Sequence, residues 1–200
     1  MNKARLEAFS DGVIAIIITI MVLELKAPHG DDWQALGSLF SKFLAYILSF
    51  LYVGIYWNNH HHLIKACRGV TGGIMWANLH LLFWLSLLPF VTAWAGEHPF
   101  TSVPGVCYGV VLLLSGLAYF LLQKLILAGH GNNSVLALAI GRDCKGWTSL
   151  LLYIAGIALS LWSPRLAALA YLAPALMWLV PDRRLERALS GTKSDRGLVE

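Results

Sequence analysis

Charged side chains are scarce in this sequence: they make up 13% of its 200 residues, whereas 58% of the residues are apolar. A soluble globular domain carries about 25% charged and about 45–50% apolar residues. A chain of this length cannot bury so much apolar sequence in one soluble core, because the surface of such a core needs polar cover. The composition excludes an ordinary soluble enzyme domain and a disordered chain, and it predicts an integral membrane protein in contact with lipid.

The short motifs that mark catalytic and cofactor sites are also absent. The sequence contains no G-x-S-x-G, no H-E-x-x-H and no C-x-x-C-H haem attachment motif. Its three cysteines are an odd set and imply no disulfide framework. The glycine pairs do not follow strands, so they do not predict a phosphate-binding loop. We therefore expect no enzymatic activity and no cofactor.

Long apolar segments dominate the sequence instead. A helix needs about 20 apolar residues to cross about 30 Å of hydrocarbon, and no segment shows the strict alternation of a transmembrane strand. Six segments are candidates: residues 7–25, 39–59, 73–95, 103–127, 146–162 and 164–181. The last two meet at Ser163-Pro164, which predicts a tight hairpin, and Pro89 predicts a kink in the third. The expected fold class is an all-α membrane protein with a six-helix domain over residues 1–182 and a basic tail over residues 183–200.

The basic residues predict how the chain lies in the membrane. Twelve of the 15 Lys and Arg residues fall on one side of the six segments. These twelve are Lys3, Arg5, Lys65, Arg68, Lys124, Arg142, Lys145, Arg183, Arg184, Arg187, Lys193 and Arg196. Because short cytoplasmic segments carry the excess of Lys and Arg, both termini are expected in the cytoplasm of a multi-pass plasma-membrane protein. The same distribution explains the net charge of +4 without a nucleic-acid partner.

Asp11 stands out in the first span, because an ionisable residue inside a membrane segment is costly and marks a functional candidate. One interpretation is that Ser10 or Asp11 caps the helix from its cytoplasmic end. The other is that the helix starts earlier, which leaves Asp11 inside it and in need of a partner. Polar residues expected at a comparable depth are Arg5, His61, His62 and Asn78.

One face of the first span carries a single hydroxyl among apolar side chains. At about 100° per residue, Gly12, Ile16, Thr19 and Leu23 fall within an arc of about 60°, whereas Asp11 points about 100° away. Thr19 either bonds back to a carbonyl of its own helix or presents its oxygen to a passing solute.

Three consecutive histidines, His60, His61 and His62, end the second span. Consecutive helical positions point in different directions and cannot all reach one ion, and the i, i+4 spacing of helical metal ligands is absent. We therefore expect no resident metal, and we expect one or two of these rings to turn inward toward the first span.

The start of the first span resembles the R-x-x-x-F-S-D signature of the transmembrane protein 175 potassium channels. Here the signature reads Arg5-x-x-x-Phe9-Ser10-Asp11. The resemblance continues with Trp57 and His61-His62 in the second span and with Asn78-Leu79 and Leu88-Pro89-Phe90 in the third. It covers about residues 1–95, and His60 and His80 depart from the family pattern. Animal members carry two six-span repeats, so this chain is similar to the bacterial branch, whose members form homotetramers.

The resemblance implies a potassium pore on the four-fold axis, lined by the first span of each subunit. The family's constriction positions correspond to Ile16, Ile20 and Leu23, and its pore threonine corresponds to Thr19. A potassium ion would be held only transiently, near Ile16 and Thr19. The family's polar network corresponds to Arg5, Ser10, Asp11, Trp57, His61 or His62, and Asn78, with Phe9 as a further signature residue.

The sequence also lacks the TVGYG loop whose carbonyls strip water from potassium in other channels. An intact pore helix has no free carbonyls, so selectivity would rest on side chains and would favour potassium over sodium only modestly. A narrow isoleucine ring would also close by dewetting. The alternative function is a proton-coupled secondary transporter in which Asp11 and a histidine relay protons.

Overall fold

The computed structural model describes residues 2–129 and 143–179, and these residues form helices and connecting loops without a strand. The helices are α1 (Lys3–Leu23), α2 (Trp33–Gly37), α3 (Phe40–Ala66), α4 (Gly72–Ser86), α5 (Leu88–Glu97), α6 (Ser102–Ala128), α8 (Cys144–Trp162) and α9 (Pro164–Leu179). The all-helical fold class predicted from the sequence is thereby confirmed. The predicted tail over residues 183–200 lies outside the described residues.

Five stretches are long and apolar enough to cross a membrane: Lys3–Leu23, Phe40–Ala66, Gly72–Glu97, Ser102–Ala128 and Cys144–Trp162. They coincide with the first five predicted spans to within a few residues, except that α3 runs seven residues beyond the predicted end. The sixth candidate, α9, has 16 residues. At 1.5 Å per residue it is about 24 Å long, shorter than the hydrocarbon layer, so the six-span count stays a prediction.

The third span is broken into α4 and α5 one turn from Pro89. Helix α4 ends at Ser86, Leu87 caps it, and α5 begins at Leu88 with the proline in its first turn. Proline has no N–H to donate and its ring clashes with the carbonyl four residues earlier, which is why the helix is interrupted at this position. Beyond the break, Thr92 of α5 donates a hydrogen bond to Ser49 of α3 at 2.7 Å.

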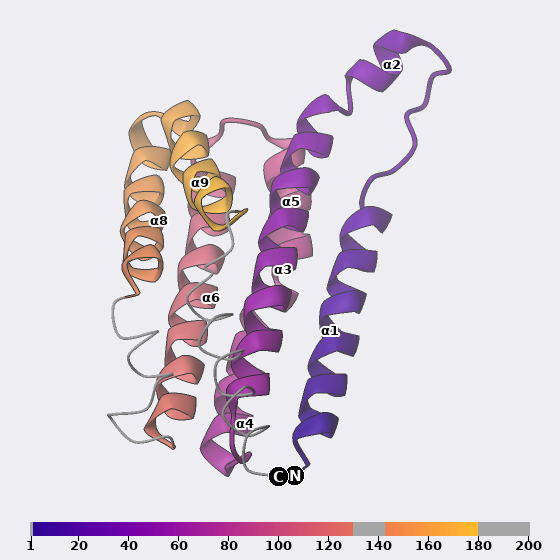
Figure 1. Cartoon of the computed structure of the whole chain (residues 1–200). Coiled ribbons are helices and arrows are strands. Elements are labelled where there is room, and N and C mark those ends of the chain that lie inside the picture. Colours follow the sequence, from indigo (N-terminus) through magenta and orange to yellow (C-terminus); the bar gives the residue numbers. More distant parts are fainter. Residues whose placement is uncertain (1, 130–142, 180–200) are drawn as a thin grey trace.

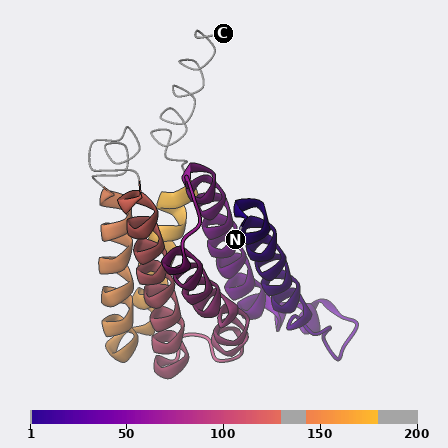
Figure 2. The same cartoon turned by 90° about the horizontal axis from the view of Figure 1, so that it is seen from below.

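The helices form a bundle with α1 at one edge and the α8–α9 hairpin at the other (Figure 1). Helix α1 packs against α3, α4 and α5, whereas α6 packs against α4, α5, α8 and α9. The hairpin turns at Ser163, as the Ser163-Pro164 pair predicts. Helix α2 stands beyond the end of the bundle in the long α1–α3 connection, and Figure 2 shows α1 again on the outer edge.

Candidate functional site

Helix α1 has one face packed into the bundle and an opposite face without cover. The packed face consists of Leu6, Ser10, Ile14, Ile17 and Met21. The opposite face carries the stripe predicted from the sequence: Gly12, Ile16, Thr19, Ile20 and Leu23 are all exposed. Ile16 is 58% and Leu23 71% exposed, so the described chain leaves a row of large apolar side chains uncovered along one helix.

Thr19 bonds back to its own helix, as one of the two sequence interpretations predicts. Its hydroxyl donates to the Ala15 carbonyl at 2.9 Å. That bond uses the only hydrogen of the hydroxyl, and the oxygen keeps its lone pairs on the exposed face. The side chain can therefore accept from water or contact a cation while its own helix stays fully bonded.

Ser10, His60 and Asn78 form a buried polar triad that joins three helices. All three side chains are at most 1% exposed. The Asn78 amide nitrogen of α4 donates to Ser10 Oγ of α1 at 2.9 Å, and the Asn78 Oδ1 lies 2.7 Å from His60 Nε2 of α3. Ser10 is thus a packing residue and not a cap, because α1 begins at Lys3 and Asn2 caps it.

The direction of each bond in the triad follows from Ser10. Its hydroxyl donates to the Leu6 carbonyl at 2.9 Å, so it can only accept from Asn78. The Asn78 oxygen must then face His60, and His60 Nε2 must carry a hydrogen. The other ring nitrogen, Nδ1, is buried and has no hydrogen-bond partner among the described residues. The triad therefore leaves one buried acceptor, His60 Nδ1, unpaired in the part of the chain that the structure describes.

A second set of polar contacts runs along the seam between α1 and α3. His61 Nδ1 lies 2.8 Å from Glu7 Oε1, and Trp57 Nε1 donates to Asp11 Oδ1 at 3.0 Å. The two pairs are one helical turn apart on both helices, and the Trp57 and His61 rings stack at 6.3 Å between centroids. Lys3 continues the row by donating to the carbonyls of Lys65 and Cys67. We call the contacts of Lys3, Glu7 and Asp11 with α3 the seam ladder.

The structure divides the predicted polar network in two. Ser10 and Asn78 belong to the buried triad, and Asp11, Trp57 and His61 belong to the seam ladder. His62 makes an edge-on ring contact with His61. Arg5 and Phe9 are exposed, and the Arg5 side chain makes no hydrogen bond or ion pair with the residues that the structure describes.

Two polar residues of this region, Glu7 and His60, are not among the residues of the predicted polar network. Both carry a signal in the sequence. Glu7 stands four residues before Asp11, as Trp57 stands four before His61, so each pair shares a helix face. The buried residues of α3 recur at intervals of three and four, namely Ser49, Tyr52, Val53, Tyr56, His60, Leu63 and Ile64. His60 falls within this repeat and is therefore the histidine that points into the bundle.

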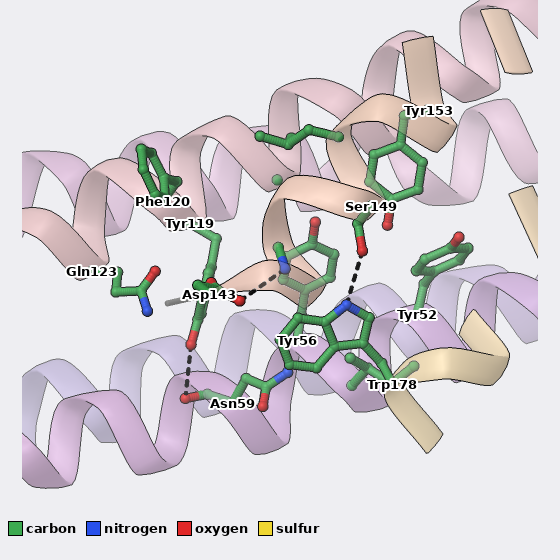
Figure 3. Close-up of a pocket in the computed structure, with 14 residues that line it drawn as sticks. Tyr52, Tyr56, Asn59, Tyr119, Phe120, Gln123, Asp143, Ser149, Tyr153 and Trp178 are labelled. Atoms are coloured by element: carbon green, nitrogen blue, oxygen red, sulfur yellow. Dashed lines mark hydrogen bonds between the residues drawn. The ribbon is translucent and has the colours of Figure 1, made fainter. Parts of the chain in front are cut away.

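A separate small cavity of about 50 Å³ lies between α3, α6, α8 and α9 (Figure 3). Several of its lining residues are aromatic. Tyr119 donates to the Asn59 carbonyl at 3.3 Å, and Trp178 donates to Ser149 Oγ at 2.9 Å. Gln123 Oε1 is buried and has no hydrogen-bond partner in residues 2–129 and 143–179. The cavity has room for a few waters, which could satisfy this oxygen, and it is too small for an ion pathway. No group of three or more His, Cys, Asp or Glu in the described ranges could hold a metal ion.

The fold and the site define a class: a multi-pass helical membrane protein whose first span carries carboxylates and is pinned to its neighbours by polar contacts. A family model described as the endosomal/lysosomal potassium channel TMEM175 matches residues 5–89, which include the seam ladder residues Glu7 and Asp11 and the whole triad. The chain is 53% identical over 189 residues to a protein named potassium channel from Chryseobacterium sp. (strain P1-3), covering 94% of this chain and 98% of that one. The chain belongs to the TMEM175 family.

Other relatives agree with this assignment. The structure matches a crystal structure of a lysosomal potassium-selective channel TMEM175 homologue from Chamaesiphon minutus, with a TM-score of 0.76, 27% identity, and coverage of 90% of this chain and 97% of that one. The mouse endosomal/lysosomal proton channel TMEM175 is 37% identical over 101 residues, which are 44% of this chain and 20% of the mouse protein. The family consists of ion channels and not of enzymes, as the absence of catalytic motifs predicts.

Proposed function

We propose that this chain is one subunit of a homotetrameric potassium channel whose pore is lined by α1. The observation that carries the proposal is the uncovered face of α1, on which Ile16, Thr19 and Leu23 lie in one row. We choose potassium as the permeating ion because the chain belongs to a family whose bacterial relatives are named potassium channel. Both termini would lie in the cytoplasm and the protein in the plasma membrane.

The seam ladder supports a pore at this face because it fixes the rotation of α1. Glu7 and Asp11 both contact α3, and at about 100° per residue they lie roughly 130° around the helix from the row of Ile16, Thr19 and Leu23. The triad holds the back of the helix through Ser10. A helix held from the back and from one side keeps the apolar row turned away from its own subunit.

Selectivity in such a pore must come from side chains. Helix α1 is continuous from Lys3 to Leu23, so its carbonyls are engaged in helical hydrogen bonds and none is free for an ion. Four Thr19 oxygens would replace part of the ion's water, one turn from a ring of Ile16 side chains about 4.5 Å away along the axis. Ile16, with Ile20 and Leu23, would form a constriction that closes by dewetting and disfavours strongly hydrated ions. The preference for potassium over sodium would be modest.

Potassium and sodium flux from liposomes tests the proposal. Ile16→Asn should wet the constriction and raise the flux of both ions, and Thr19→Ala should lower the ratio of potassium to sodium flux. Ile154→Asn is the matched control, because Ile154 is 53% exposed on α8, at the far edge of the bundle, and should leave flux unchanged. Unchanged conductance and selectivity in both α1 variants would remove α1 from the ion path.

The second candidate function is a proton-coupled transporter. The observation in its favour is the Glu7–His61 pair, a carboxylate and an imidazole in contact within a membrane-spanning helix pair. Asp11, the carboxylate that the sequence suggested for this role, contacts Trp57 and not a histidine. Single-channel currents decide between the two functions: a carrier cycles through conformational steps of microseconds or longer, so currents above about a million ions per second exclude it.

A further inference from the structure

An apolar groove of about 420 Å³ opens on the surface of the bundle, and no residue of α1 lines it. Its walls are the first half of α3, the loop between α5 and α6, and the first half of α9, at the end of the bundle where the α5–α6 loop lies in Figure 1. This volume is within the range of about 300–1,000 Å³ that is typical of ligand sites. On the predicted topology this end of the bundle faces the outer leaflet.

The length of the groove along the helix axes matches the thickness of one leaflet of a bilayer. On α3 it extends from Phe40 to Leu51, and on α9 from Pro164 to Leu172. At 1.5 Å per residue the α3 wall is about 16 Å long, and half of the hydrocarbon layer is about 15 Å thick. The groove therefore begins where α3 and α9 begin and ends near the middle of the membrane, which suits an acyl chain better than a helix that crosses both leaflets.

The polar atoms deep in the groove are already paired within the chain. Tyr171 Oη donates to the Gly105 carbonyl at 2.9 Å, and Tyr108 Oη is hydrogen-bonded to Ser49 Oγ at 2.9 Å. What remains for an occupant is the apolar surface of residues such as Leu44, Leu48 and Ala168. The inner part of the groove can therefore take a hydrocarbon tail without leaving a polar group unsatisfied.

A positively charged side chain lies next to the groove wall at the start of α9. Arg165 directly follows Pro164 of the groove wall, its side chain is exposed, and it has no hydrogen-bond or ion-pair partner in the part of the chain that the structure describes. Lys42, next to Ser41 of the opposite wall, is already in an ion pair with Glu97 at 2.9 Å. Arg165 is thus a cation available to a phosphate at the level where a lipid headgroup lies.

We propose that this groove is a lipid-binding site that takes an anionic phospholipid, with one acyl chain between α3 and α9 and its phosphate at Arg165. The site is separate from α1, so the lipid would act on the stability of the bundle and not on the ion path. The proposal does not depend on which ion the protein conducts.

Native mass spectrometry of the purified protein tests this site, with added dioleoyl phosphatidylglycerol or dioleoyl phosphatidylcholine as the probe. The wild-type protein should retain phosphatidylglycerol under conditions that remove phosphatidylcholine. Ala168→Trp should abolish retention of both lipids, because Ala168 lines the groove. Arg165→Gln should keep the groove open and lower the preference for phosphatidylglycerol about fivefold.

Leu169→Trp is the matched control, because Leu169 is the next residue of α9, is 60% exposed and does not line the groove. It should bind lipid as the wild type does. Ala45→Phe narrows the same groove from the α3 wall and should reproduce the loss if Ala168→Trp fails to fold. Unchanged lipid retention in both groove variants would overturn the proposal. A changed oligomeric mass with lipid retention intact would assign the groove to a second copy of the chain and would also overturn it.

Discussion

At the scale of single residues, Asn78 is the side chain that joins α4 to both α1 and α3. Its amide bonds to Ser10 of α1 on one side and to His60 of α3 on the other, in a region where all three side chains are buried. Water cannot replace either bond, because no open surface reaches these atoms. Removing the amide would leave the His60 Nε2 hydrogen without an acceptor, next to an Nδ1 that already has no partner among the described residues. Ser10 would lose the donor to its oxygen and keep its bond to the Leu6 carbonyl.

We therefore expect Asn78→Ala to lower the free energy of unfolding by about 1–3 kcal/mol, the cost of leaving buried polar groups without partners. Thermal melting in detergent measures the change. Asn59→Ala is the control, since Asn59 lies on α3, is only half-buried and makes no side-chain hydrogen bond with the described residues. Equal melting temperatures for the Asn78→Ala variant and the wild type would mean that the triad contributes nothing to holding α1.

The Asp11–Trp57 contact leads to a second prediction at this scale, on both stability and channel activity. Trp57→Phe removes the hydrogen-bond donor, and Asp11→Asn removes the charge of the acceptor. The double variant should therefore lose less stability than the sum of the losses in the two single variants. We expect a coupling of about 0.5–1.5 kcal/mol between them. In flux experiments each variant should reduce the fraction of active channels and leave the potassium to sodium ratio unchanged. A change of selectivity with normal assembly would place Asp11 in the ion path instead of the seam.

Helical periodicity in the sequence predicted that Ile16, Thr19 and Leu23 share one face of α1, but not the partner of each polar side chain. The rotation of α1 follows from its own pattern, so Ile16, Thr19 and Leu23 could be placed together in advance. Whether Trp57 or a histidine meets Asp11 depends on the rotation of α3, which is set by distant packing against α5 and α9. The histidine that joins Asn78 was left open in the sequence for the same reason, although the buried repeat of α3 includes His60.

At the scale of helices, small residues determine how closely α6, α8 and α9 approach. A side chain at Gly156 of α8 or at Gly109 of α6 would collide with the Tyr171 ring of α9. In lipid, helices associate through van der Waals packing, so glycine at such a crossing permits close contact. Tyr171 uses that closeness to reach the Gly105 carbonyl and Ser160.

Gly156→Ala should therefore destabilise the protein although alanine is the better helix former. The methyl group would meet the buried Tyr171 ring, and overpacking of this kind costs about 1–3 kcal/mol. Gly54→Ala on α3 is the matched control, because nothing lies within 4 Å of its added carbon, and it should be neutral or stabilising by up to about 1 kcal/mol. Melting temperatures of the two variants against the wild type measure the difference. If Gly156→Ala melts no lower than Gly54→Ala, the contact with Tyr171 is looser than the structure indicates.

The helix boundaries were the most predictable part of the fold, because the lengths of the apolar segments and the positions of proline indicate where helices begin and end. The break in the third span is an example, since Pro89 predicts it and the structure has it at Leu87. The far end of α3 was less predictable: polar residues from Asn58 to His62 suggested that the helix ends there, yet it continues to Ala66. Tertiary contacts of His60 and His61 with α4 and α1 keep these polar residues helical.

At the scale of the whole molecule, one subunit alone cannot enclose a pore that α1 lines. Its apolar face with Ile16 and Leu23 would then be covered by the same face of other copies around a shared axis. A single shared pore and four separate pores make different predictions for mixed assemblies. The Thr19 position distinguishes them, because it lies on the uncovered face midway along the row.

Thr19→Cys subunits mixed with wild-type subunits provide the test, after Cys107 and Cys144, the two native cysteines that are not buried, have been replaced by serine in both. A bulky thiol reagent on one Thr19→Cys side chain should block a pore shared by four subunits. In a 1:1 mixture only about one-sixteenth of randomly assembled tetramers would lack the new thiol, so the reagent should remove nearly all potassium flux. Separate pores in each subunit would leave about half of the flux, because the wild-type subunits conduct independently. Residual flux near one half would therefore contradict a common axis, and flux unaffected even in the pure Thr19→Cys protein would contradict α1 as the pore helix.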